Sequence, residues 1–293
     1  MNRNLALGLL AALAAALIGS GWQIASRHGV TTTLGPVELA ALRYAVPALV
    51  LLPLLIQTGL FPQGLPRRRL GLLVLGGGLP FGLLVMAGMQ WAPAAHMGVF
   101  GAGSVPLFTA LGARLVQGEP ISGLRLAGLL LVVAGLAVFG ASSLADAAQT
   151  WRGDLLFILA AMVWAMYTLT FRGSGLTPWQ GAAVINAWSS LLLLPMLLAL
   201  GAPRLLTAPW TDVAWQALGQ GVAAGLLGLV TYMIAIAKLG AARASLSAAL
   251  VPLSTALGAA WLLGEPLGAG TLVASGLVAC GVALASGALG RHG

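Results

Sequence analysis

The sequence carries very little charge. Of its 293 residues only 7% are Asp, Glu, Lys or Arg, whereas 59% are hydrophobic. A soluble globular protein carries about 25% charged residues, so this composition excludes an ordinary soluble domain. Apolar runs of roughly 20 residues, each long enough to cross a bilayer, alternate instead with short polar breaks. The sequence therefore predicts an all-α integral membrane protein.

Several features of other protein classes are also missing. The single cysteine, Cys280, excludes an intrachain disulfide and lies in an apolar run, where we interpret it as a small packing residue. There is no phosphate-binding loop, no His-Glu-x-x-His sequence and no Cys/His cluster. The net charge is +8, but its 14 Lys and Arg are scattered, unlike those of a nucleic-acid binder. We therefore expect no catalytic residue, cofactor, metal or nucleic-acid partner.

What the sequence does contain is a series of ten apolar runs. Their ends are marked by proline, glycine and charge, as at Gly118-Glu119-Pro120 and Gly264-Glu265-Pro266. We expect ten transmembrane helices, at roughly 4–26, 37–57, 70–90, 95–116, 122–142, 153–171, 179–200, 213–236, 242–263 and 268–288.

The basic residues predict an orientation for these helices. With the N-terminus in the cytoplasm, ten of the 14 Lys and Arg lie on the inner side. The other four, Arg27, Arg43, Arg152 and Arg204, lie on the outer side. Because cytoplasmic loops carry the excess of basic residues, we expect a multi-pass protein of a bacterial-type inner (plasma) membrane. An even number of spans then places both termini in the cytoplasm.

The two halves of the chain share a repeated sequence. Residues 105–113 (VPLFTALGA) match residues 251–259 (VPLSTALGA), and the two Gly-Glu-Pro tripeptides match at the same offset of 146. Arg27 and Arg172 match more weakly, at an offset of 145. A unit of five spans is odd, so its two copies insert in opposite orientations, as in many secondary transporters. We therefore expect two inverted repeats, 1–147 and 148–293, around a central cavity.

These features resemble a known family. Two five-helix halves, each with Pro-x-x-Thr-Ala-Leu followed by Gly-Glu-Pro, are similar to the EamA-type transporters of the drug/metabolite transporter superfamily. The charge-poor, aromatic interior resembles that of the YddG-type exporters of aromatic and other neutral amino acids. The resemblance implies a cavity lined by spans 1–4 and 6–9, with spans 5 and 10 outside.

Polar and aromatic side chains concentrate in the spans that the resemblance places around the cavity. Polar groups inside a membrane need a partner or a wet cavity. Each candidate also has a plainer interpretation: aromatic anchoring at the interface, bonding to its own helix, or bonding between helices. The predicted cavity residues are Trp22, Gln23, Met86, Gln90, His96, Phe100, Trp164, Tyr167, Asn186, Trp188 and Tyr232, and the predicted hinges are Pro47, Pro80, Pro106 and Pro252.

Charged residues add further expectations. Arg43 lies one turn inside span 2 and either snorkels to the outer surface or meets a substrate carboxylate in an outward-open vestibule. We interpret Glu119 and Glu265, each before a proline, as structural residues at helix starts. All six acids lie at or near helix ends, which argues against proton-coupled export of cations. His96 is then the one candidate that titrates near neutral pH.

The function predicted from the sequence is secondary transport. We expect alternating access and export of small neutral or zwitterionic metabolites, above all aromatic or apolar amino acids. Other metabolites or drugs, such as sugar conjugates and nucleobases, are the alternative cargo. A membrane-embedded enzyme acting on lipid-linked substrates and a channel or scaffold are more remote alternatives. The expected partners are the small-molecule substrate and the lipid bilayer, and the expected oligomeric state is a monomer or weak dimer.

Overall fold

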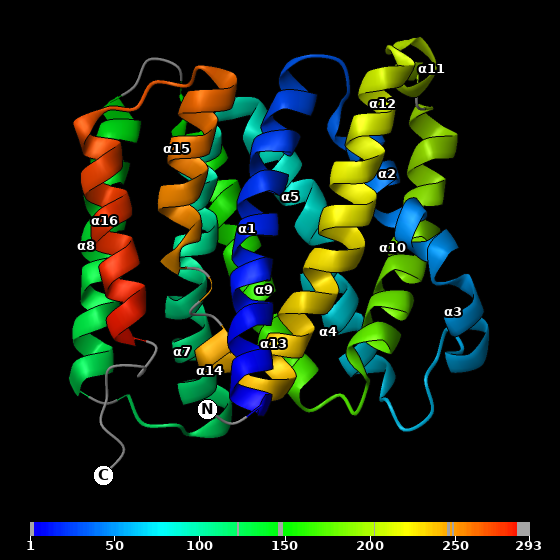
Figure 1. Ribbon diagram of the computed structural model, residues 1–293, viewed down its shortest axis with the longest axis horizontal. Helices are drawn as coiled ribbons and strands as arrows, with labels where there is room; N and C mark the ends of the chain where they lie inside the picture. The colour runs from blue at the N-terminus through cyan, green and yellow to red at the C-terminus, as the bar shows by residue number, and fades with distance from the viewer. Residues whose placement is uncertain are drawn as a thin grey trace.

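The computed structural model describes residues 3–121, 123–145, 149–201, 203–244, 247 and 249–285, and they form a bundle of helices (Figure 1). Helices suit a lipid environment because they satisfy their own backbone hydrogen bonds. The first half contains α1 (Arg3–Thr31), α2 (Pro36–Val50), α3 (Leu52–Thr58), α4 (Arg67–Gly77), α5 (Leu79–Trp91), α6 (Ala94–His96), the π-helix η1 (Met97–Gly101), the 3-10 helix η2 (Ala102–Ser104), α7 (Val105–Gln117) and α8 (Gly123–Ala145). The second contains α9 (Trp151–Arg172), α10 (Pro178–Leu200), α11 (Pro203–Thr207), α12 (Trp210–Gln216), the π-helix η3 (Ala217–Gly228), α13 (Leu229–Leu239), α14 (Ala241–Ala244), α15 (Val251–Leu263) and α16 (Ala269–Ala285).

Seven helical segments are long and apolar enough to cross a membrane: Arg3–Thr31, Arg67–Trp91, Ala94–Gln117, Gly123–Leu144, Trp151–Arg172, Pro178–Leu200 and Trp210–Leu239. An eighth span is formed if α2 and α3, bent by 70° relative to each other, count as one. The expected ninth and tenth spans contain α15 and α16, which are shorter, at 13 and 17 residues, and both expected spans include residues outside the described part. The chain is thus a multi-pass, all-helical membrane protein with seven or eight such spans among its described residues.

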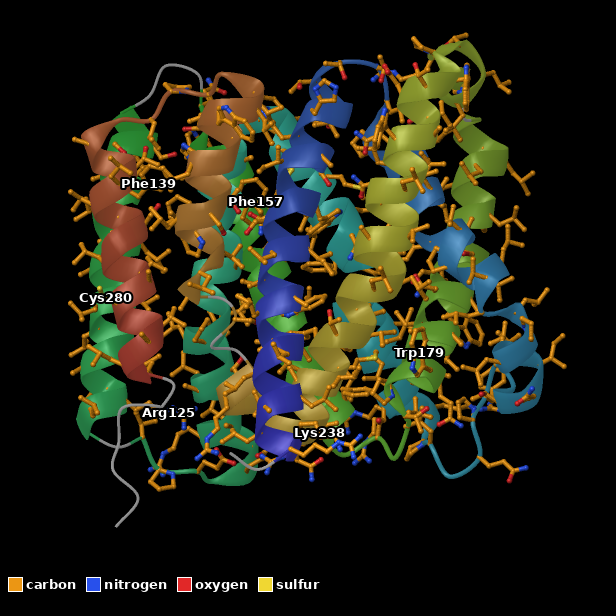
Figure 2. The ribbon with its side chains drawn as sticks, in the orientation of Figure 1. Arg125, Phe139, Phe157, Trp179, Lys238 and Cys280 are labelled. Carbon is orange, nitrogen blue, oxygen red and sulfur yellow. The ribbon has the colours of Figure 1, made fainter. Side chains whose placement is uncertain are left out.

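The outside of the bundle is apolar. Leu115 and Trp261 are each 84% exposed, and many other leucines point outward. A soluble monomer rarely exposes so much continuous apolar surface, whereas a lipid-facing surface is built this way. Cys280 lies exposed on the outer flank of α16, so its interpretation as a packing residue was wrong (Figure 2). A free cysteine behaves as a small hydrophobic residue, which suits an exposed position on a membrane helix.

The repeated sequence adopts the same local structure twice. α7 and α15 both have 13 residues and begin at positions 105 and 251, which keeps the offset of 146. Each ends at a glycine in the left-handed conformation, Gly118 with φ of 70° and Gly264 with φ of 67°, which are favourable for glycine alone. Figure 1 shows that α7 runs toward the end of the bundle where α1 begins, whereas α15 runs away from it. These equivalent helices therefore point in opposite directions.

Two helices stand apart on one flank. α8 and α16 pack closely against each other, away from α1 and α10 (Figure 1). Their backbones approach at Gly128 and Gly281, where a Cβ built on Gly128 would lie 2.5 Å from the Gly281 carbonyl oxygen. Small residues permit such close packing of membrane helices. α1, in contrast, packs against α13, α15 and η3 of the second half, so it belongs to the interface between the halves.

The four predicted hinge prolines all lie at or near helix interruptions. Pro47 lies inside α2, shortly before the bend into α3, and Pro80 follows the break at Gly78 between α4 and α5. Pro106 and Pro252 lie in the first turns of α7 and α15. Proline lacks the backbone N–H that continues a helix, which explains these positions. Whether the helices move there stays a prediction.

Candidate functional site

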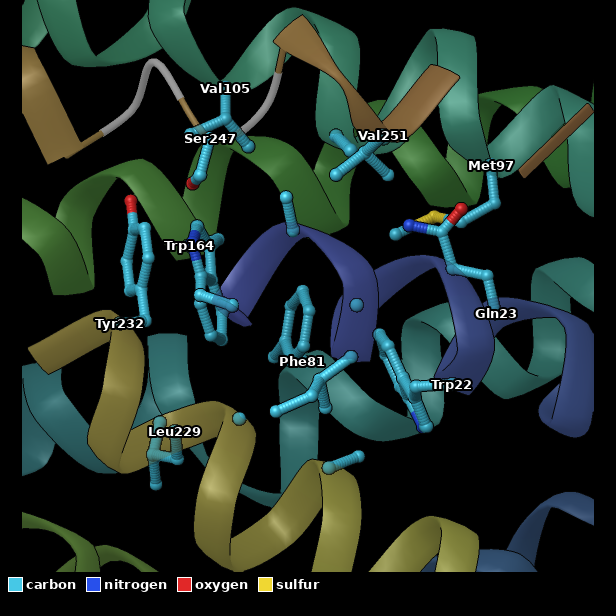
Figure 3. A pocket seen from close by; sticks show the side chains of 18 of the residues that line it. Trp22, Gln23, Phe81, Met97, Val105, Trp164, Leu229, Tyr232, Ser247 and Val251 are labelled. Atoms are coloured by element: carbon cyan, nitrogen blue, oxygen red, sulfur yellow. The ribbon is translucent and has the colours of Figure 1, made fainter. Parts of the chain in front are cut away.

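A cavity of about 110 Å³ lies among α1, α2, α5, η1, η2, α9, η3 and α13, with the first residues of α7 and α15 also in its wall (Figure 3). The described α10 supplies none of its lining. Most of its wall is apolar or aromatic, and both halves contribute. The lining residues are Ala15, Ala16, Ile18, Gly19, Trp22, Gln23, Arg43, Phe81, Met97, Gly101, Ala102, Val105, Ala161, Trp164, Ala224, Gly228, Leu229, Tyr232, Ser247 and Val251.

Four aromatic rings form a row along the cavity (Figure 3). The ring centroids of Trp22 and Phe81 are 5.8 Å apart, those of Phe81 and Trp164 4.6 Å, and those of Trp164 and Tyr232 5.2 Å. Such tilted contacts stabilise the rings beyond the burial of their surface. The row crosses from the first half of the chain to the second, and it offers an apolar wall to a ligand.

The Trp22 ring is fixed by the π-helix η3. Its Nε1 donates to Oε1 of Gln220 at 2.7 Å, and Gln220 Nε2 in turn donates to Ser26 Oγ at 3.0 Å and to Gln216 Oε1 at 3.1 Å. π-Helical segments often occur at functional sites. Here the segment brings a fully bonded amide to the back of a cavity residue. Buried hydrogen bonds of this kind hold a side chain in one orientation.

Arg43 is a cavity residue that the sequence left between two interpretations. Its side chain is buried, with 4% of the residue exposed, so it does not snorkel to the surface. The guanidinium carbon lies 4.2 Å from the centroid of the Trp22 ring and 5.6 Å from that of Tyr44. The Nε and Nη1 atoms of Arg43 have no hydrogen-bond partner in the described part of the chain. Arg43 also lines the cavity.

Of the predicted cavity residues, the structure brings together Trp22, Gln23, Trp164 and Tyr232. Gln23 is also bonded across the halves, since its Oε1 accepts from Thr255 Oγ1 at 3.0 Å. Phe81 and Met97 line the cavity without having been predicted, and so does Arg43, for which contact with substrate was one of two interpretations. Phe81 and Met97 carried no polar signal in the sequence, and only their neighbours in space reveal them.

The other predicted residues do not line this cavity. Met86, Phe100 and Tyr167 are buried in the apolar core, and Gln90 is exposed at the end of α5. Asn186 bonds between helices, with its Nδ2 donating to the Gly225 carbonyl oxygen at 3.2 Å.

Trp188 and His96 also have partners outside the cavity. Trp188 donates from Nε1 to the Leu60 carbonyl oxygen at 2.8 Å. His96 lies outside the cavity beside a carboxylate. Its Nδ1 is 2.8 Å from Oδ1 of Asp154, and the other oxygen of Asp154 accepts from the hydroxyl of Ser143. The two residues are 58 positions apart, so the sequence gave no sign of this pair.

Two ion pairs join the halves at opposite ends of the bundle. At the end of α1, Arg27 Nε lies 3.1 Å from Glu265 Oε1, whose carboxylate also accepts from the Ala94 backbone N–H. At the end of α9, Arg172 Nη1 lies 3.8 Å from Glu119 Oε1. Arg27 corresponds to Arg172 and Glu265 to Glu119 in the repeated sequence. Each arginine therefore pairs with the acid of the other half.

The two pairs differ in burial. The side chains of Arg27 and Glu265 are 21% and 11% exposed, whereas those of Arg172 and Glu119 are 54% and 39% exposed. Arg27 also donates from Nη1 to the Met89 carbonyl oxygen. The bundle is therefore more tightly joined at the end where α1 finishes. From the sequence we interpreted the two acids only as helix-start residues. The two arginines repeat at an offset of 145 and the two acids at 146, and this similarity was the signal that could have predicted the pairs.

Comparison with known proteins identifies the family. The EamA-like transporter family matches the chain twice, over residues 6–141 and 151–287. The chain belongs to the EamA-like transporter family. This family is a family of membrane transporters, which agrees with the resemblance seen in the sequence.

Individual relatives of this EamA-like transporter add the fold but no substrate. A protein of Pseudomonas aeruginosa, named only as uncharacterised, is 33% identical over 177 residues. That match covers 57% of this chain and 58% of the relative, so the chain spans less than two thirds of that relative's length. A crystal structure with 20% identity superimposes with a TM-score of 0.64 and covers 98% of this chain and 99% of its own. At that identity it shows a shared fold.

The described part of this EamA-like transporter contains no cluster of side chains suited to bind a metal ion. No cluster of three or more His, Cys, Asp or Glu side chains that could hold a metal ion occurs among residues 3–285, apart from the gaps in that range. The cavity wall instead offers aromatic rings, a few neutral polar groups and one guanidinium.

Proposed function

We propose that the protein is a secondary transporter that exports small neutral or zwitterionic metabolites, foremost amino acids with aromatic or apolar side chains. The observation that carries this proposal is the cavity between the halves, with its row of four aromatic rings. Ligand sites combine such apolar walls with a few placed polar groups. Gln23, Ser247 and Tyr232 supply neutral polar groups here.

We further propose that transport proceeds by alternating access between two inverted five-helix halves, 1–147 and 148–293. Three observations support this. The family matches each half separately. The equivalent helices α7 and α15 run in opposite directions. Finally, equivalent ion pairs join the halves at the two ends of the bundle. Breaking one pair while keeping the other opens the cavity to one side at a time.

The same proposal includes an orientation and a compartment. The distribution of basic residues favours a bacterial-type inner membrane with both termini in the cytoplasm. Figure 1 is consistent with this, because α1 begins and α16 ends at the same end of the bundle. Figure 2 places Arg125 and Lys238 at that end as well. The partly buried pair of Arg27 and Glu265 then closes the outer side, and the protein acts as a monomer or weak dimer.

The size of the cavity bears on the cargo. An enclosed apolar cavity of about 150 Å³ holds a benzene molecule. The cavity, at about 110 Å³, is smaller, so an aromatic cargo requires the halves to separate before it enters. We therefore propose that this conformation is a contracted state, closed on the outer side.

Uptake into proteoliposomes tests the function. Purified protein is reconstituted, the vesicles are loaded with unlabelled amino acid, and exchange with external labelled phenylalanine, leucine or alanine is measured. We expect exchange that requires the protein and is fastest for apolar or aromatic side chains. If no neutral amino acid is exchanged while nucleobases or sugar conjugates are, the cargo class is wrong. If no solute of any class is exchanged, the proposal of transport through this cavity fails.

A further inference from the structure

Arg43 carries the one charge in the described wall of the cavity. The residue is 4% exposed, and its Nε and Nη1 atoms have no hydrogen-bond partner among the described residues. Removing a guanidinium from water is costly unless charges or hydrogen bonds replace its hydration. An arginine held in this condition beside an open space is arranged for a partner that arrives from outside the chain.

The neighbours of Arg43 hold it in place without neutralising it. The faces of Trp22 and Tyr44 lie 4.2 and 5.6 Å from the guanidinium carbon, and cation–π contacts compensate only part of the lost hydration. Both rings are themselves fixed, Trp22 by Gln220 and Tyr44 by a bond from its hydroxyl to the Gly78 carbonyl oxygen at 2.6 Å. The Tyr44 hydroxyl also interacts with Arg43. The charge is therefore positioned rather than paired.

The nearby acids of the described chain are engaged elsewhere. Glu265 pairs with Arg27, Glu119 with Arg172, and Asp154 lies against His96. Glu38, one turn before Arg43 on α2, accepts a hydrogen bond from the Gly35 backbone N–H. None of the ion pairs within the described residues includes Arg43.

We infer that Arg43 binds the carboxylate of the cargo, and that the carboxylate is the part of the head group that this transporter requires. This assignment rests on the proposed function, because it takes the cavity to be the transport site. The carboxylate meets the free Arg43 donors, and such charge-assisted hydrogen bonds are among the strongest available. The apolar tail of the cargo then lies against Phe81 and Trp164.

The charge balance of the cavity redefines the substrate class: it requires a carboxylate, so it adds carboxylate anions to the zwitterionic amino acids proposed above and sets aside neutral cargo without a carboxylate. A single carboxylate neutralises Arg43, whereas the described residues of the wall include no acid that would neutralise an ammonium group. The amino group of an amino acid meets only neutral acceptors, so it contributes little to binding. The cargo class is therefore carboxylates with an apolar or aromatic tail, with or without an α-amino group.

Three ligands with one phenyl tail separate these contributions. They are phenylalanine, 3-phenylpropionate, which lacks the amino group, and 2-phenylethylamine, which lacks the carboxylate. Binding is measured as the rise in unfolding temperature in detergent, and transport as competition with labelled phenylalanine in proteoliposomes. In the natural protein we expect both carboxylates to raise the unfolding temperature and to compete, with the amine at least tenfold weaker.

The variants are Arg43→Gln and Arg43→Lys, with Arg152→Gln as the matched control. Arg152 also lies over a tryptophan, with its guanidinium carbon 4.9 Å from the centroid of Trp91, but it is exposed and outside the cavity. We expect Arg43→Gln to lose at least tenfold in carboxylate affinity and to abolish the preference over the amine. Arg43→Lys retains part of the preference, and Arg152→Gln leaves it unchanged.

Two further measurements distinguish a binding role of Arg43 from a structural one. Without ligand, Arg43→Gln unfolds at the same temperature as the natural protein or higher, because an unpaired buried charge has been removed. A large fall in that temperature would show that Arg43 is structural and would overturn the assignment. So would an amine that binds as well as the acid, or a carboxylate preference that survives in Arg43→Gln. If carboxylates stabilise the natural protein through Arg43 yet no solute is transported, the proposed function fails while the carboxylate site stands.

Discussion

The ion pair between Arg27 and Glu265 leads to a quantitative prediction about access to the cavity. We consider Glu265→Gln, which removes the charge but keeps an oxygen that can accept from the Ala94 N–H. An exposed ion pair contributes about 0.2–1 kcal/mol, and breaking a fully buried one costs about 3–5 kcal/mol. With side chains 21% and 11% exposed, this pair lies between these limits, so we take about 1–2 kcal/mol.

That free energy sets the expected change in access. If the pair stabilises the state closed at the end of α1, its loss multiplies the population open at that end by about 5 to 30. Glu119→Gln is the matched control. Glu119 lies 3.8 Å from Arg172, in a pair with side chains 54% and 39% exposed, so the pair across the halves contributes less than about 1 kcal/mol. Its second partner, Arg125 at 4.0 Å, belongs to the same half and does not join the two. Glu119→Gln therefore changes access by less than about fivefold, and at the other end of the bundle.

Thiol labelling measures the two changes separately. Cys280 is first replaced by alanine, because it is exposed on α16. A reporter cysteine then replaces Gly19, which lines the cavity and where a Cβ meets no atom within 4 Å. A membrane-impermeant thiol reagent is added to either face of sealed vesicles. We expect Glu265→Gln to speed labelling about 5- to 30-fold from the face where α1 ends, and not from the other.

Two results would refute this reasoning. An unchanged rate from the face where α1 ends would show that the pair does not hold that end closed. An equal rise from both faces would show general loosening of the bundle rather than opening at one end. A double variant that carries both Arg27→Gln and Glu265→Gln completes a double-mutant cycle. If the two residues act through each other, the double variant opens no further than the stronger single variant.

Two further predictions concern packing and the aromatic row. Gly128→Val lowers the free energy of unfolding by about 1–3 kcal/mol, because the new side chain meets the backbone of α16. Gly276→Ala is the control and is nearly neutral, because Gly276 has open space around it. Thermal unfolding in detergent distinguishes the two variants. Trp22→Phe keeps an aromatic ring but loses the bond to Gln220, so affinity for 3-phenylpropionate falls about 2- to 12-fold, the equivalent of roughly 0.5–1.5 kcal/mol. Gln220→Ala causes a similar fall, and the double variant is no worse than the weaker binder of the two single variants.

The sequence predicted much of the fold because the signals were either long or repeated. Hydropathy identified the helices, since backbone in lipid has few alternatives to the helix. The sequence repeated at an offset of 146 forms α7 and α15, which have equal length and end at equivalent glycines. Short segments were harder: α15 and α16 fall below the length of a full span, and ten spans in two inverted halves stay a prediction. Neither π-helix had a signal in the periodicity of the sequence.

The site was less predictable, because proximity in space decides it. Trp164 was identified from its depth in its span and Trp22 from the polar residues beside it, and both line the cavity. His96 was expected there as an isolated histidine, but the fold brings Asp154 to it from 58 positions away. Arg43 lies one turn inside its span, and its position along the chain is compatible with snorkelling. Only the packing of Trp22 over its guanidinium shows that it points inward.

The π-helix η3 makes α13 sensitive to changes made at a distance from the cavity. It spans 12 residues and leads directly into α13, which carries Tyr232 to the end of the aromatic row. Successive residues of an α-helix are rotated by about 100°, because a turn contains 3.6 residues. A π-helix, whose hydrogen bonds join residues i and i+5, has a smaller rotation per residue, so re-forming η3 as an α-helix would turn α13 about its axis while leaving the helix continuous. The phenol would rotate out of line with Trp164, so the hydrogen-bond pattern of one segment sets the rotation of a whole cavity wall.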